Sequence, residues 1–249
     1  MATYQTRGAW QAAQGGTVET LADIDFTALG ADDWTAGGAT RTLGGETWSL
    51  LNQGTTGGWG PDGTNLVWLP SSGSGWYAST RSGSALAISL STLDASVDDD
   101  ARYAAIIEIP SWPASLANYA RIGVSFWDPG TAGEYYGVAC GPGHIGSDCT
   151  YGSQYAASDV LSESATTRRS FAIVLEPTGF CGIYVSSTPS VDLIDFTPLG
   201  AVRAGALVNY TRTTLRTKPS VANVGIVATG LNGKTFNFNR LTVQKYPGA

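Results

Sequence analysis

The chain is a succession of short apolar runs of strand length, separated about every ten residues by Gly, Pro, Asn and Asp. Leu86, Ile88 and Leu90 alternate with small residues, which is the two-residue period of a strand with one buried face. The Asn-Gly pair at 232–233 is a typical hairpin turn. This pattern predicts an all-β protein that folds as a sandwich or barrel.

Strands are predicted wherever such a run is bounded by turn residues. The predicted ranges are 47–53, 65–70, 86–91, 103–110, 121–128, 134–141, 168–176, 181–186, 207–216, 224–228 and 236–245. The pattern favours one short helix, around 113–119, with Ser111 or Ser115 as its cap.

The final strand changes phase. Phe236 and Phe238 share one face, whereas Leu241 and Val243 have the opposite parity. A bulge near Asn239-Arg240 would return all four to one buried face.

Composition excludes several functional classes. Charged residues make up 14% of the chain against a usual 25% or so, and 43% is hydrophobic, so the chain is expected to be folded. The net charge is −6 and no basic run exceeds Arg168-Arg169, which argues against nucleic acid as a partner. No apolar segment is long enough for a membrane span, and the N-terminus lacks the apolar core of a signal peptide.

Residues 1–20 lack a periodic pattern and contain Gly15-Gly16, so we predict an N-terminal arm followed by one domain over 21–249. The sequence of residues 24–31, IDFTALGA, recurs at 194–201 with seven of eight positions identical. Too few residues follow the second copy for a tandem domain. We therefore expect two strand-and-turn pieces with similar local demands.

Four segments together carry a family resemblance: residues 23–30, 45–48, 120–128 and 236–243. They resemble the concanavalin A-like jelly-roll domains of structural proteins in tailed bacteriophages, from tail fibres or capsid decoration. The resemblance implies a two-sheet antiparallel jelly-roll sandwich whose first and last strands are neighbours. It also implies display on a virion, with contacts to host-surface glycans or to neighbouring virion subunits. The arm would then be a tether, with Tyr4, Arg7 and Trp10 as its partner-binding residues.

Glycan-cleaving relatives of this fold carry three acids in a pattern such as Glu-x-Asp-x-x-Glu, because hydrolysis needs two carboxyl groups about 5–9.5 Å apart. The nearest strings here are 23–25, 159–163 and 192–195, and none has that spacing. A hydrolase would need carboxylates that converge from separate strands. Asp98–Asp100 lacks the calcium-loop pattern, so we expect an acidic turn in water. We predict no catalytic residue, no metal and no cofactor.

The stretch 135–149, YYGVACGPGHIGSDC, holds the only histidine and two of the three cysteines. Cys140, His144, Cys149 and Cys181 form the donor set of a zinc site, but the spacing is not that of a zinc knuckle. A Cys140–Cys149 disulfide is the second alternative. The simplest interpretation is a Gly-Pro-Gly loop with a solvent-facing histidine.

Aromatic residues in glycine-rich surroundings are the remaining functional signal. Trp59, Trp76 and Tyr77 could stack on sugars, with Asp62 and Asn65 binding the hydroxyls. The alternative is that these rings pack in the core or against a subunit. Tyr135, Tyr136, Tyr151 and Tyr155 could form a second contact surface.

The sequence therefore predicts a non-enzymatic bacteriophage virion protein on the particle surface, assembled in the host cytoplasm and released by lysis. Its expected partners are other virion proteins, copies of itself in a homo-oligomer, and a host glycan. The alternatives are a secreted carbohydrate-binding module and, ranked last, a glycoside hydrolase of the same fold.

Overall fold

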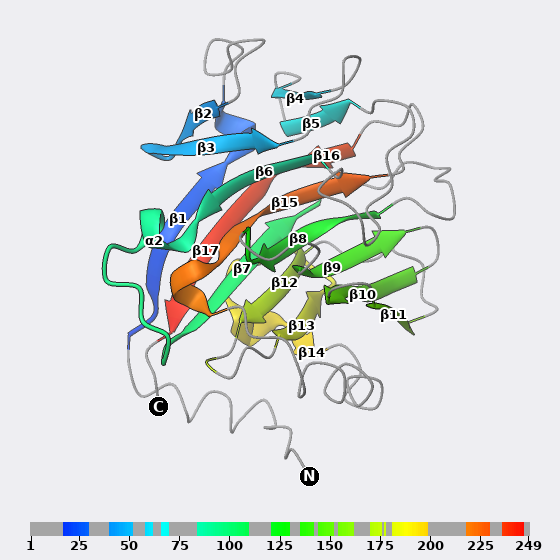
Figure 1. Cartoon of the computed structure of the whole chain (residues 1–249). Coiled ribbons are helices and arrows are strands. Elements are labelled where there is room, and N and C mark those ends of the chain that lie inside the picture. Colours follow the sequence, from blue (N-terminus) through cyan, green and yellow to red (C-terminus); the bar gives the residue numbers. More distant parts are fainter. Residues whose placement is uncertain are drawn as a thin grey trace.

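A computed structural model describes residues 17–29, 40–51, 58–61, 66–69, 84–109, 121–129, 135–141, 144–151, 154–161, 170–175, 177, 181–198, 218–229 and 236–246. These residues form two large antiparallel sheets and one small one (Figure 1). Helical structure among them is limited to four short segments: η1 (Phe26–Ala28), α2 (Leu90–Leu93), η4 (Leu193–Asp195) and η5 (Pro219–Val221). None of these helices is long and apolar enough to cross a membrane.

In spatial order, sheet A contains β1 (Glu19–Asp25), β17 (Arg240–Tyr246), β7 (Arg102–Glu108), β12 (Ser170–Leu175), β13 (Cys181–Ser186) and β14 (Thr197–Pro198). Sheet B contains β11 (Gln154–Leu161), β10 (His144–Tyr151), β9 (Tyr135–Gly141), β8 (Arg121–Trp127), β15 (Asn223–Thr229), β6 (Ser84–Ser89), β3 (Glu46–Leu51) and β2 (Thr40–Leu43). Sheet C contains β16 (Phe236–Phe238), β5 (Leu66–Leu69) and β4 (Gly58–Pro61).

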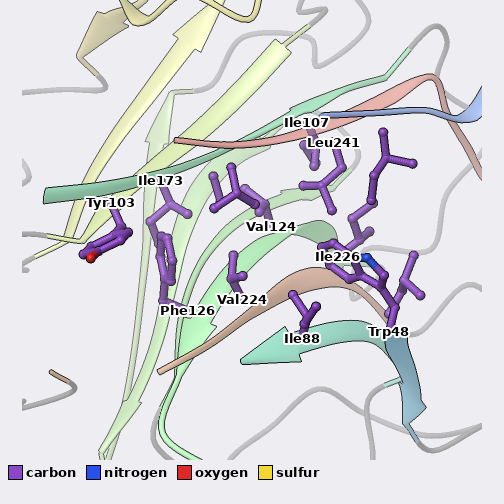
Figure 2. Close-up of a cluster of buried hydrophobic side chains, with 14 of the residues drawn as sticks. Trp48, Ile88, Tyr103, Ile107, Val124, Phe126, Ile173, Val224, Ile226 and Leu241 are labelled. Atoms are coloured by element: carbon purple, nitrogen blue, oxygen red, sulfur yellow. The ribbon is translucent and has the colours of Figure 1, made fainter. Parts of the chain in front are cut away.

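The main core lies between sheets A and B, where alternate residues of each strand pack together (Figure 2). Val124 and Phe126 on β8 and Ile226 on β15 are fully buried there. Trp48 on β3 is also fully buried, and its Nε1–H donates to the carbonyl oxygen of Leu43 at 3.2 Å. That bond gives the one polar atom of the ring a partner in an apolar environment.

Sheet A is covered on its outer face as well. Ile106 on β7 and Val174 on β12 point away from the main core, yet both are buried. Leu193 and Phe196 pack on them from residues 187–198, which cross this face as a strap. Burial of both faces explains why β7 and β12 read as almost continuous apolar runs rather than as alternating ones.

The first and last strands are neighbours, as the family resemblance implies. β1 pairs antiparallel with β17, with Glu19 opposite Lys245 and Asp25 opposite Arg240. The chain therefore enters β1 and leaves β17 at one end of the sandwich. β16 precedes β17 across Asn239, so sheet C lies at the opposite end (Figure 1).

The phase change in the last strand is a break between two strands rather than the predicted bulge. β16 ends at Phe238 and joins sheet C, whereas β17 begins at Arg240 and joins sheet A. The Asn239 N–H donates to the Glu108 carbonyl oxygen at 3.0 Å. Phe238 and Leu241 are nevertheless both fully buried in the main core, because the break resets the alternation.

Most of the predicted strands that fall on described residues are confirmed with shifts of a few residues at their ends. The predicted strand 207–216 and the predicted helix 113–119 lie outside the described residues. The strands that were not predicted are β1, β2, β4, β10, β11 and β14. β1 begins at Glu19, so it includes the last two residues of the predicted arm.

The turn between β2 and β3 gives a first stability prediction. Gly44 and Gly45 have φ values of +61° and +86°, which match a two-residue hairpin turn with both residues left-handed. We expect Gly45→Ala to lower the free energy of unfolding by about 1–2 kcal/mol, because alanine is strained at positive φ. Gly44→Asn is the control and should be nearly neutral, because asparagine tolerates this region. Denaturant unfolding of both variants checks this, and equal losses would contradict it.

Candidate functional site

The outer face of sheet B presents small, polar and aromatic residues. On β8, Ser125 and Trp127 alternate with the core residues Val124 and Phe126. On β15, Asn223 and Gly225 occupy the outer positions in the same way. The face is covered unevenly: Ser125 is fully buried, whereas Trp127 and Asn223 are half-buried.

One transverse row of this face combines aromatic and hydrogen-bonding residues. Asn223 pairs with Ser89 on one side and with Trp127 on the other. Phe126 pairs with Tyr136, so the next position aligns Trp127 with Tyr135. The row then continues through the pairs Tyr135–Thr150 and Thr150–Tyr155. We call Ser89, Asn223, Trp127, Tyr135, Thr150 and Tyr155 the aromatic row.

The next row along the strands is built from small residues. It runs through Ala87, Gly225, Ser125, Gly137 and Asp148. Only the aspartate among them carries a formal charge, and Ala87 is 1% exposed. Ser125 and Gly225 are buried as well, so the described part of this small-residue row is shielded from solvent.

Trp59 lies on β4 in a row with Trp68 and Phe236. Directly paired residues share one face of a sheet, and so do residues two apart on a strand. This row is therefore on the same face of sheet C as Phe238, which is buried in the main core. The register places Trp59 in this row, and both the sugar contact and the packing alternative for it stay predictions.

The other predicted contact residues lie outside the described residues: Asp62, Asn65, Trp76 and Tyr77 for the glycan, and Tyr4, Arg7 and Trp10 for the arm. Of the four tyrosines considered as a second surface, Tyr135 and Tyr155 belong to the aromatic row. Tyr136 pairs with the core residue Phe126 instead. The aromatic row was not predicted as a unit, because the order of strands in a sheet is not visible in a sequence.

The stretch that holds the single histidine is a hairpin rather than the predicted loop. β9 ends at Gly141 and β10 begins at His144, its direct partner. Cys140 lies opposite Ile145, four residues before Cys149 on the same strand. That separation is about 13 Å, well beyond the 4.4–6.8 Å between the Cα atoms of a disulfide. The register therefore argues against a Cys140–Cys149 bond.

The backbone also separates the zinc-donor candidates. His144 and Cys149 are five residues apart on β10, about 17 Å along the strand. Cys181 begins β13 in the other sheet. Within the described ranges, no group of three or more His, Cys, Asp and Glu residues is placed to hold a metal ion.

The acidic turn at 98–100 is used for local structure. Asp98 Oδ1 accepts a hydrogen bond from the Asp100 N–H at 2.8 Å, and Asp99 Oδ1 accepts one from the Ser220 N–H at 2.9 Å. Asp99 Oδ2 lies 3.6 Å from the Lys218 ammonium. Burial would raise the pKa of Asp99, but the Ser220 and Lys218 contacts outweigh it and lower that pKa. Two of the three carboxylates therefore have different partners: Asp98 binds within the turn, and Asp99 binds Ser220 and Lys218.

A buried polar cluster that the sequence did not predict surrounds Asp94, which is 5% exposed. Its Oδ2 accepts hydrogen bonds from Lys245 Nζ at 2.7 Å and Tyr103 Oη at 2.9 Å. Its Oδ1 accepts bonds from the Ser96 N–H and hydroxyl at 2.9 and 2.8 Å. We call these four residues the Asp94 network. It ties the turn after α2 to β7 and β17.

The Asp94 network shifts the titration of its members. Burial would raise the pKa of Asp94, but the bonds from Lys245, Ser96 and Tyr103 outweigh burial and lower that pKa to about 2. Burial would lower the pKa of Lys245, and the bond to Asp94 raises it instead. Both residues are therefore charged at neutral pH, and their ion pair links the turn after α2 to β17.

Of the acidic strings considered for catalysis, Asp23 is held by the guanidinium of Arg240, and that bond lowers the pKa of the Asp23 carboxyl. Asp195 accepts a hydrogen bond from Ser190 at 2.7 Å within the strap on sheet A. These carboxylates lie on β1 and on the strap, in different parts of the molecule.

No protein family model and no curated protein matches the chain. Solved structures resemble it at low identity. A protein of unknown function from Shewanella oneidensis MR-1 is 9% identical over 98% of this chain and 96% of its own, with a TM-score of 0.47. The CBM2 module of the evolved Dit of Lactobacillus casei BL23 phage J-1 is 9% identical over 93% and 98%, with a TM-score of 0.45. An alginate lyase of polysaccharide lyase family 7 is 13% identical over 80% and 91%, with a TM-score of 0.37. The chain's own strand order makes it an antiparallel jelly-roll sandwich.

Proposed function

We propose that this chain is a non-enzymatic structural protein of a bacteriophage virion, displayed on the particle surface as capsid decoration or as part of a tail fibre. The attribution to a phage rests on the sequence resemblance. Its partners would be other virion proteins or copies of itself, and it would reach the virion in the host cytoplasm before lysis.

The observation that carries this proposal is the pairing of β1 with β17. Glu19 lies opposite Lys245, so the chain enters and leaves the sandwich at one end. Along β17, six residue steps separate Tyr246 at that end from Arg240 at the other, a distance of about 20 Å. An arm that tethers the domain through β1 would hold it by one end and present the other outward.

The proposal is tested by the molar mass of the full chain and of a variant that lacks residues 1–16. That deletion ends before Thr17 and leaves β1 intact, whereas deleting 1–20 would remove the pair to Lys245. We expect a trimer or larger species that becomes a monomer without the arm, at an unchanged melting temperature. Purified particles of the phage that encodes the chain should contain the full protein and not the truncated one. Absence of the full protein from those particles would contradict the proposal.

The second candidate is a carbohydrate-binding module, which the aromatic row favours. A protein that binds glycan as a monomer and is absent from particles would fit this candidate better. A glycoside hydrolase is ranked last, and it would have to release reducing ends from a polysaccharide.

A further inference from the structure

We propose that Arg41 keeps the free edge of β2 from pairing with the same edge of a second copy of this chain. In the part of the chain that the structure describes, β2 is the last strand at one side of sheet B (Figure 1). The outward N–H and C=O groups of such an edge strand are a template on which another chain can add a strand. This role of Arg41 goes beyond the proposed function and does not depend on it.

Two other edge strands, both in sheet A, are protected in familiar ways. β14 is two residues long and ends with Pro198, which has no N–H to donate. β1 has an irregular register between Thr20 and Ala22, and it carries exposed carboxylates, among them Glu19 and Asp25. Short strands, prolines, bulges and charges all oppose pairing at an edge.

β2 has no proline, no bulge and no exposed charge. Its register with β3 is unbroken from Thr40 to Leu43, and its exposed residues are Thr40 and Thr42. Threonine is uncharged and suits strands, so these positions favour an added strand rather than oppose it. The charged residue of β2 is Arg41, and it is only 6% exposed. An inward-pointing charge is the remaining way to protect an edge strand.

The Arg41 side chain starts on the inner face of sheet B and reaches the edge of β2. Arg41 is the direct partner of Trp48, which is fully buried in the main core, so both side chains leave the same face of the sheet. The Arg41 Nη1 donates a hydrogen bond to the Thr40 carbonyl oxygen at 2.6 Å. The guanidinium is therefore held against the backbone of its own strand.

The register shows that this carbonyl group points to the free edge. Leu43 and Glu46 flank the two-residue hairpin loop and form a hydrogen-bonded pair, and bonded and non-bonded pairs alternate along an antiparallel ladder. Thr40 and Thr42 therefore direct their N–H and C=O groups away from β3. The guanidinium thus occupies a carbonyl oxygen that an added strand would have to use.

A second copy that paired at this edge would have to displace the guanidinium or enclose it further. Losing a charge-assisted hydrogen bond and removing a charge from water both cost free energy. A two-fold pair of β2 strands would also bring two guanidinium groups to one seam, where like charges repel. Arg41 therefore disfavours the edge-to-edge dimer in two ways.

The test is the molar mass of the full chain by size exclusion with light scattering, over a series of protein concentrations. Arg41→Met keeps the length of the side chain and removes its charge. We expect its molar mass at high concentration to be about twice that of the unchanged protein or more, because a two-fold edge contact joins two copies. Arg41→Lys keeps a positive charge and is the matched control, with the molar mass of the unchanged protein.

A second substitution tests whether the association uses the β2 edge. Thr42→Pro removes an N–H that points to the free edge and is not used in pairing with β3, so the fold should tolerate it. The double variant Arg41→Met with Thr42→Pro should return to the molar mass of the unchanged protein. Melting temperatures show that each variant is folded. If Arg41→Met does not fold, Arg41→Gln, which also lacks the charge, takes its place.

Three results would overturn this role of Arg41. The first is a folded Arg41→Met protein with the molar mass of the unchanged protein at every concentration. The second is equal association of Arg41→Met and Arg41→Lys, and the third is association that persists with Thr42→Pro. None of them bears on the presence of the chain in particles, so the proposed function stands or falls separately.

Discussion

Asp94→Ala is expected to lower the free energy of unfolding by about 3–5 kcal/mol at pH 7. The carboxylate is 5% exposed and accepts bonds from three residues, so its removal leaves the Lys245 ammonium, itself only 14% exposed on its side chain, without a counter-charge. Denaturant unfolding followed by tryptophan fluorescence measures this loss. Asp100→Asn is the control, because it removes an exposed charge from the neighbouring turn and should change stability by less than about 0.5 kcal/mol.

Asp94 should also make the free energy of unfolding depend on pH in the acid range. Its pKa is lowered from 3.8 to about 2, so the folded state binds this proton less readily than the unfolded state. The corresponding stability, about 2 kcal/mol, is fully present above pH 4 and is lost as the pH falls toward 2. The difference in the free energy of unfolding between the unchanged protein and Asp94→Ala should therefore shrink by about 2 kcal/mol between pH 4 and pH 2. A constant difference would contradict the assignment.

Replacing Asp94 and Lys245 together measures how much their ion pair contributes to stability, apart from the other bonds of the Asp94 network. Asp94→Ala with Lys245→Met leaves no buried charge unpaired, so the double variant should lose less than the sum of the two single losses. Simple additivity would mean that Asp94 stabilises the fold mainly through Tyr103 and Ser96.

The sequence predicts strands well where burial is one-sided, because alternation then marks the core face. β8 and β6 are examples: their core residues Val124, Phe126, Leu86 and Ile88 alternate with outward ones. β10 and β11 were missed because their apolar residues do not alternate. β1 was missed because its outer half carries exposed residues and only Ile24 is buried.

The recurrent octapeptide shows how tertiary context overrides local sequence. In the first copy Asp25 ends β1 and caps η1, and Phe26 enters the main core. In the second copy η4 comes first and β14 follows, and Phe196 packs on the outer face of sheet A. Both copies use the phenylalanine as an anchor, as expected of similar local demands, but the backbone around it differs.

The candidate site could be predicted only in part, because it depends on strand order. Alternation assigns Trp127 and Asn223 to outer positions on their own strands. Their adjacency requires β15 to lie between β8 and β6, although almost 100 residues separate β8 from β15. The Asp94 network is hidden for the same reason, since Asp94 and Lys245 are 151 residues apart. Sequence patterns report the faces of elements, and long-range pairing decides which faces meet.

Gly225→Ala is expected to be the most damaging conservative change on sheet B. A Cβ at this position would lie 2.2 Å from the Leu86 carbonyl oxygen and 2.9 Å from the Ala87 Cα. Both atoms belong to the backbone of the paired strand β6, so relief requires β15 and β6 to move apart in the middle of the sheet. We expect a loss of about 3 kcal/mol or more in the free energy of unfolding, above the usual range for overpacking by one methyl group.

Ser49→Thr is the matched control for that change. It also adds one methyl group to the outer face of sheet B, on β3, where Ser49 pairs with Ala87 and is half-buried. Threonine suits a strand, so the variant should stay within about 0.5 kcal/mol of the unchanged protein. Denaturant unfolding measures both variants side by side. A Gly225→Ala protein as stable as the control would mean that β15 and β6 are not held as close together as the structure shows.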